Sequence, residues 1–159
     1  GKELVYVSWN DSQQGAVNIL NLRNGRISKL TKQPGKYVEP VFSPDGKTLA
    51  FSSRRIPGFY ADTARLQLYD ISSEKQRELT TNWDRSVSSF IWAADGKGFY
   101  SSIDDAASRR LYYIDAKTGK ERAITKATSF GQPALAGKNR MLATIDSFLY
   151  PARLVMVDS

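Results

Sequence analysis

The chain has 159 residues, of which 41% are hydrophobic and 25% charged, enough for one folded domain with its own core. It contains no cysteine and no histidine, which excludes disulfides, zinc sites built on Cys and His, and the Ser-His-Asp and Cys-His arrangements of hydrolases. The net charge is +7, but the lysines and arginines are spread over predicted turns among acidic residues, so we expect no nucleic-acid partner. No apolar run approaches the roughly 20 residues of a membrane span, so we expect no membrane partner.

Two short patterns repeat along the chain and define a common unit. Residues 41–53, VFSPDGKTLAFSS, align with residues 91–103, IWAADGKGFYSSI, and each reads as two strands joined by an Asp-Gly turn. The segments that end at Thr31, Thr80 and Thr125 align without a gap, and each again predicts a hairpin. Joined in order, the two hairpins make four antiparallel strands over about 45–50 residues, the size of one propeller blade.

In chain order the repeats predict four blades. Residues 1–32 form a partial blade, residues 38–81 and 87–126 form two complete four-stranded blades, and residues 130–159 form a second partial blade. No segment carries a sustained 3.6-residue apolar period, so we expect almost no helix. The fold class predicted from the sequence is therefore all-β, a partial β-propeller.

The two terminal blades each match only part of the complete unit. Gly1-Lys2 corresponds to the turn at Gly46-Lys47, so the chain starts at the second strand, and Asp158 corresponds to Asp70, which precedes the turn to the fourth strand. A propeller ring closes with about four to eight blades, and each blade has a face that only a neighbour covers. The sequence therefore predicts a fragment of one larger propeller, with strand counts of three, four, four and three, whose open faces drive self-association.

Three motifs in a fixed order make this interpretation more specific. They are the turn SPDGK at 43–47, the loop and strand PGFYADTARLQLYD at 57–70, and the segment NWDRSVSSFIWAADGK at 82–97. This ordered set, with SFLYPARLVMVD at 147–158, resembles the propeller domain of bacterial prolyl oligopeptidase family serine peptidases, in particular their dipeptidyl-peptidase and acylaminoacyl-peptidase-like members. The resemblance implies a Ser-Asp-His triad on a separate α/β-hydrolase catalytic domain, whose Gly-x-Ser-x-Gly elbow is absent from this chain.

The resemblance also implies a role for the loop at residues 54–65. The propeller would wall the catalytic chamber, limit substrate size and help to position short peptides, and the loop residues expected to do so are Arg55, Tyr60, Asp62 and Arg65. Relatives often carry a Glu shortly before the Ala-Asp pair, whereas Tyr60 stands before Ala61-Asp62 here. Asp62 is then the carboxylate that would pair with a free α-amino group. The alternative is an exposed hairpin loop with incidental charges, and the choice between aminopeptidase and endopeptidase stays open.

Two other groups of charged residues receive a structural interpretation. Trp83, Asp84 and Arg85 lie between two predicted blades, where an arginine stacked on tryptophan or paired with aspartate would brace the connection. Asp104-Asp105 is expected as a solvated turn pair near Arg109-Arg110, and it lacks the Asp-x-Asp-x-Asp-Gly spacing of a calcium loop. We therefore expect no metal site and no cofactor.

Two further function classes remain open from the sequence. A TolB-type propeller would bind proteins or peptides without an attached enzyme, and propellers fused to metal-dependent amidohydrolases also use the Pro-Asp-Gly turn. The Pro57-Gly58 loop and the segment Asp84–Val87 favour the peptidase interpretation. The sequence does not distinguish a periplasmic from a cytoplasmic location.

Overall fold

The structure is a computed structural model that describes residues 2–12, 14–33, 35–56, 58–126, 128–138 and 140–158. Gly1 and Pro57, which belong to motifs named above, lie outside the described residues. Every regular element in the described ranges is a β-strand, which confirms the all-β prediction, and these ranges hold no helix of the length and apolarity of a membrane span. The chain divides into two compact units, residues 1–78 and 79–159.

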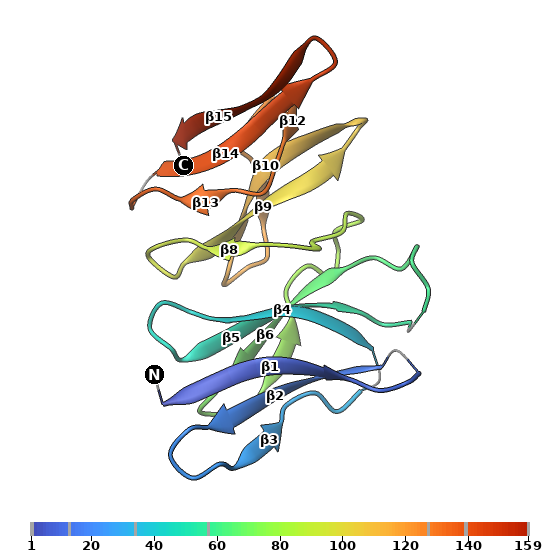
Figure 1. The fold of residues 1–159 in the computed structure, drawn as a ribbon, viewed down its shortest axis with the longest axis vertical. Coiled ribbons are helices and arrows are strands. Elements are labelled where there is room, and N and C mark those ends of the chain that lie inside the picture. Colours follow the sequence, from blue (N-terminus) through green and yellow to red (C-terminus); the bar gives the residue numbers. More distant parts are fainter. Residues whose placement is uncertain are drawn as a thin grey trace. The chain divides into compact units, whose positions relative to one another are not determined.

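The first unit contains two antiparallel sheets (Figure 1). One sheet has three strands, in the order β1 (Glu3–Trp9), β2 (Gly15–Asn21) and β3 (Ile27–Lys29). The other has four, in the order β4 (Lys36–Phe42), β5 (Thr48–Arg54), β6 (Arg65–Asp70) and β7 (Gln76–Glu78). Consecutive strands are neighbours in both sheets, as expected of a propeller blade.

The second unit contains the other two sheets. The first consists of β8 (Ile91–Trp92), β9 (Gly98–Asp105), β10 (Ser108–Asp115) and β11 (Glu121–Ala123). The second consists of β12 (Ser129–Phe130), β13 (Ala134–Leu135), β14 (Arg140–Ser147) and β15 (Tyr150–Asp158). β15 occupies one edge of β14, so β12 and β13 must share the other edge, where they pair with successive parts of β14. This sheet therefore has four strands where the sequence predicted three, because two short strands, β12 and β13, line the same edge of β14.

The repeated strand-turn pattern arises from one local hydrogen-bonding arrangement. Asn21, Asp70 and Asp115 each end a strand, and each side chain accepts a backbone N–H from the following turn. Four residues later the backbone enters the left-handed region in all three copies, at Gly25 with φ 69°, Glu74 with φ 56° and Gly119 with φ 74°. The middle copy therefore places a glutamate in a conformation that glycine adopts at lower cost.

The core lies between adjacent sheets within each unit. In the first unit Val17 of β2 packs with Leu49 and Phe51 of β5, and the ring of Tyr37 meets that of Phe51 edge-on at 5.7 Å. In the second unit Leu111 of β10 packs with Phe130 and Ala143 of the neighbouring sheet. Leu49, Phe51 and Tyr100 are therefore core residues.

Candidate functional site

The connection between β5 and β6 is the most distinctive loop of the chain. It spans residues 55–64, whereas the connections between the corresponding second and third strands of the second unit contain only residues 106–107 and 148–149. Long connections on a rigid sheet commonly carry binding residues. This loop contains three of the four residues predicted to position a substrate, and the fourth, Arg65, begins the strand that follows.

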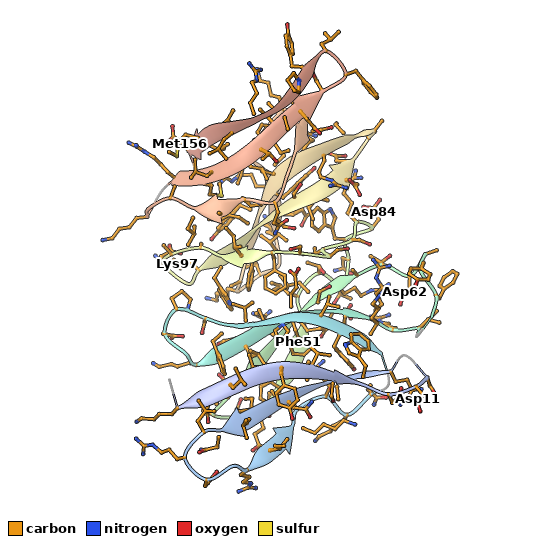
Figure 2. The ribbon with its side chains drawn as sticks, in the orientation of Figure 1. Asp11, Phe51, Asp62, Asp84, Lys97 and Met156 are labelled. Carbon is orange, nitrogen blue, oxygen red and sulfur yellow. The ribbon has the colours of Figure 1, made fainter. Side chains whose placement is uncertain are left out.

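Asp62, labelled in Figure 2, closes the loop on itself through hydrogen bonds of its carboxylate. Its Oδ2 atom accepts the backbone N–H of Arg55 at 2.5 Å and that of Ile56 at 2.9 Å, and its Oδ1 atom accepts Nη1 of Arg65 at 3.0 Å. Burial alone would raise the pKa of this carboxyl, but these donors outweigh it and hold the pKa of Asp62 below its ordinary value. The Asp62 side chain is only 8% exposed, so its charge acts on the neighbouring loop groups and is largely shielded from solvent.

Glu78 of β7 joins the same charge network, and the sequence analysis did not single it out. Both of its carboxylate oxygens accept Nη2 of Arg55, at 2.8 and 3.0 Å, and Nε of Arg65 lies 3.7 Å from Oε1. A signal existed in the repeat: two residues before the aligned Thr, the other copies have Lys29 and Ala123 where this copy has Glu78. The structure therefore brings Arg55 and Arg65 together with two carboxylates, those of Asp62 and Glu78.

Tyr60 lies apart from this network, at the tip of the loop. Its side chain is largely solvent-exposed at 80%, next to the exposed residues Ile56 and Phe59. The ammonium of Lys36 lies 5.6 Å from the centre of the Tyr60 ring, and the guanidinium of Arg54 donates to the Tyr60 carbonyl at 2.6 Å. The loop therefore presents aromatic surface on a hydrogen-bonded base.

The segment at 83–85 is anchored within the second unit. The ring of Trp83 packs against that of Tyr112 with centroids 5.2 Å apart, and Nη2 of Arg85 lies 2.8 Å from Oδ1 of Asp105. Asp84 is exposed, so the aspartate that pairs with Arg85 is Asp105 and not its neighbour in sequence. Whether this segment braces two blades stays a prediction.

Asp105 differs from the solvated turn charge expected from the sequence. It is 6% exposed, and its carboxylate also accepts the hydroxyl of Tyr112 and Nη1 of Arg110, both at 2.6 Å. The Tyr112 hydroxyl and the Arg110 guanidinium hold the pKa of Asp105 below its ordinary value. The buried carboxylate of Asp105 thus binds two arginines, Arg85 and Arg110, and the hydroxyl of Tyr112.

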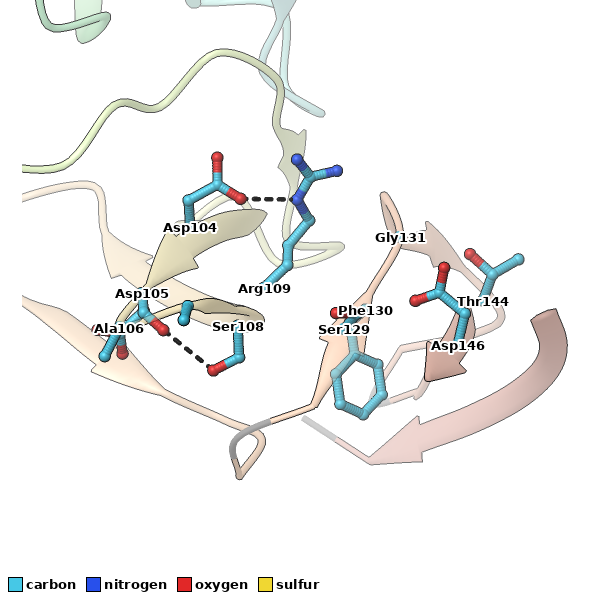
Figure 3. Close-up of a pocket in the computed structure, with 11 residues that line it drawn as sticks. Asp104, Asp105, Ala106, Ser108, Arg109, Ser129, Phe130, Gly131, Thr144 and Asp146 are labelled. Atoms are coloured by element: carbon cyan, nitrogen blue, oxygen red, sulfur yellow. Dashed lines mark hydrogen bonds and ion pairs between the residues drawn. The ribbon is translucent and has the colours of Figure 1, made fainter. Parts of the chain in front are cut away.

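The second unit also contains a polar cleft of about 500 Å³ (Figure 3). Figure 3 shows the ion pair of Asp104 and Arg109 on one wall and Thr144 with Asp146 on another. A turn that lines the cleft is strained, because Ala106 and Ala107 have φ values of 46° and 62° where Asn-Gly is usual. Within the described ranges no three Asp or Glu side chains converge as metal ligands.

Comparisons with known proteins show what this chain is similar to in sequence and in fold. No family model matches the chain. Dipeptidyl-peptidase 5 of Porphyromonas gingivalis is 31% identical over 166 aligned residues, which cover 99% of this chain and 24% of that protein. The chain therefore spans about a quarter of the length of this relative.

Solved structures show the same fold at lower identity. The puromycin-hydrolyzing peptidase of Mycobacterium tuberculosis matches 99% of this chain and 25% of its own with a TM-score of 0.75 at 15% identity. A putative TolB from Agrobacterium tumefaciens matches 99% of this chain and 58% of its own with a TM-score of 0.73 at 17% identity. At these identities both likenesses show the fold alone, and they confirm the prediction of a partial β-propeller.

The fold and the loop define a β-propeller segment. Its sequence relation at 31% identity is to dipeptidyl-peptidase 5, and it shares structure with the TolB type at low identity. The comparisons therefore confirm that the chain is similar to the propeller domain of prolyl oligopeptidase family peptidases, as its ordered motifs predicted.

Proposed function

We propose that this chain is the non-catalytic propeller portion of a serine exopeptidase or oligopeptidase, acting beside a separate α/β-hydrolase domain. Its relation to dipeptidyl-peptidase 5 over nearly its full length supports a peptidase context. The chain has no histidine, so the imidazole of a Ser-Asp-His triad would come from another domain. In this role the propeller restricts access to the catalytic chamber and helps to position short peptides.

The β5–β6 loop is the part of the chain that we propose touches the peptide. The observation that carries this is its construction: an exposed tip of Phe59 and Tyr60 stands on a base in which Asp62 binds Arg55, Ile56 and Arg65. A rigid base lowers the entropy that a loop loses on binding, and an aromatic tip offers contact area to a peptide side chain. Tyr60 makes the contact in this proposal, and Arg55, Asp62 and Arg65 hold it in place.

Pairing of Asp62 with a substrate α-amino group is a second candidate role. Both Asp62 oxygens already accept hydrogen bonds from the loop, so a substrate ammonium would have to add to these contacts. The two roles predict different effects of Asp62→Asn in the full-length enzyme. A direct pair raises KM only for peptides with a free amino terminus, whereas a loop-holding role raises KM equally for blocked and free peptides.

The proposed function is tested by Tyr60→Ala in the full-length enzyme, assayed on short peptides. We expect KM to rise about fivefold with kcat unchanged, because the lost contact serves binding and not chemistry. Leu22→Ala is the matched control, since Leu22 is equally an exposed apolar residue but lies in the β2–β3 turn. Equal KM values for both variants would refute a peptide-contact role for the loop.

A further inference from the structure

Two carboxylates hold the β5–β6 loop, and they do so in different ways. The donors to the Asp62 carboxylate are at residues 55 and 56, where the loop begins, and at residue 65, where β6 follows it, so Asp62 closes the loop at its base. Glu78 lies on the outer strand β7 and reaches the same two arginines from outside the loop. We propose that Glu78 is a positioning residue, which fixes the direction of the closed loop and thereby the place of its aromatic tip.

The Glu78 side chain is itself held in one orientation. Its Oε2 atom accepts Nε2 of Gln67 at 3.0 Å, and Gln67 is buried in β6, directly opposite Glu78 in the strand register. Nε2 of Gln67 also donates to Oγ of Ser53 in β5 at 3.1 Å. Hydrogen bonds across three strands of the sheet therefore fix the Glu78 carboxylate, and these bonds involve neither arginine.

Arg65 and Arg55 carry this fixed position into the loop. Arg65 lies between the two carboxylates, 3.0 Å from Oδ1 of Asp62 and 3.7 Å from Oε1 of Glu78, and its side chain is 18% exposed. Arg55 is held at its backbone by Asp62 and at its guanidinium by Glu78. Since Arg65 and both carboxylates are largely shielded from solvent, salt screens their attraction less than that of a surface pair.

This arrangement separates loop closure from loop direction. Loss of the Glu78 charge leaves the Asp62 hydrogen bonds intact, so the loop stays closed but its base can shift against β7. Its tip then samples more positions, and a peptide that binds must select among them, which weakens binding without altering the catalytic residues. The effect on a peptide depends on the function proposed above, whereas the anchoring of the loop does not.

The anchoring is tested by trypsin cleavage after Arg55 in the full-length protein, followed by mass spectrometry. The Arg55 side chain must leave Glu78 to enter the protease, so Glu78→Gln should increase the cleavage rate at this site about fivefold. Glu74→Gln is the matched control, because it removes the same charge from the exposed β6–β7 turn. Cleavage of Glu78→Gln at the control rate would overturn the proposal.

A kinetic readout on the same variants separates this inference from the proposed function. Glu78→Gln should raise KM for short peptides about threefold at unchanged kcat, Glu78→Asp should restore part of the loss, and Glu74→Gln should match the wild type. Faster trypsin cleavage with an unchanged KM would uphold the anchoring by Glu78 and overturn the peptide role of the loop. A fall in kcat at constant KM would overturn a positioning role for Glu78.

Discussion

Thr31 accepts the backbone N–H of Val17 through its hydroxyl oxygen at 3.1 Å. The same bond joins Thr125 to the N–H of Leu111 at 3.0 Å in the second unit, again across fourteen residues. In both copies the neighbouring backbone bond runs the other way, from the residue before the threonine to the carbonyl of the same partner. In these two copies the threonine that ends the repeat therefore attaches the end of the outer strand to the strand before it.

We expect Thr31→Val to destabilise the protein by about 1–3 kcal/mol. Thr31 is buried, so valine would leave the Val17 N–H without its acceptor in a place that water does not reach. Thr31→Ser keeps the hydroxyl and is the control, and urea unfolding of both variants measures the difference. Equal stability of the valine and serine variants would show that the hydrogen bond contributes little.

Two glycines with the same backbone conformation should respond differently to alanine. Gly25 and Gly119 have φ values of 69° and 74°, so alanine brings a similar strain of about 1 kcal/mol at either position. An added Cβ meets nothing within 4 Å at Gly25, but lies 2.2 Å from the Leu79 carbonyl oxygen at Gly119. Thermal unfolding should show Gly25→Ala losing about 1 kcal/mol and Gly119→Ala about 3 kcal/mol or more. A similar loss in both would mean that the Leu79 backbone moves aside easily.

The stability of the loop network should fall in acid. The folded-state pKa of Asp62 lies below the unfolded value of about 3.9, so its contribution is complete above about pH 5 and is lost as pH falls through the folded pKa. The free energy of unfolding should therefore decrease more steeply between pH 5 and pH 3 in the wild type than in Asp62→Asn. Asp11→Asn, at an exposed carboxylate, should keep the wild-type slope, and a wild-type slope in Asp62→Asn would contradict the prediction.

We expect the isolated chain to self-associate. In the second unit, Leu154 and Met156 of β15 are mostly exposed, while the alternate residues Val155 and Val157 pack into the core. An exposed row of apolar residues on a strand favours contact with another sheet face. Light scattering coupled to gel filtration should give a mass above 17.8 kDa that rises with concentration.

A charge placed on this row should reduce the association. Leu154→Lys puts an ammonium in the middle of the exposed face, whereas Ser12→Lys adds the same charge at an exposed loop position of the first unit. The first variant should shift the mass toward the monomer, and the second should behave as the wild type. A monomeric wild-type chain would contradict the prediction directly.

The elements and turns of this protein were predictable because they depend on residues close together in sequence. Asp45 accepts the N–H of Lys47 and the hydroxyl of Ser43, and Gly46 between them adopts φ 71°, all within one five-residue motif. The turn at Asp95-Gly96 repeats this geometry with alanine in place of the serine, since the backbone bonds suffice. Such local bonds recur wherever the motif recurs, so a repeat in the sequence predicted a repeat in the fold.

The candidate site was predictable only in part. The motif located Arg55, Tyr60, Asp62 and Arg65 together, but Glu78, which pairs with both arginines, lies thirteen residues after Arg65 on the next strand. Asp105, expected as a solvated charge, is buried because the folded chain brings Arg85 and Arg110 to it from two segments. In these cases the sequence showed the charges but not their partners.

By itself, then, the sequence determined the repeat and its turns, since the turns depend on hydrogen bonds that reach only a few residues along the chain. The tertiary structure decided which carboxylates are buried and which arginines neutralise them. It also decided that Asp62 closes the loop while Tyr60 faces solvent. Burial and ion pairing depend on which strands lie side by side, and only the folded chain brings those strands together.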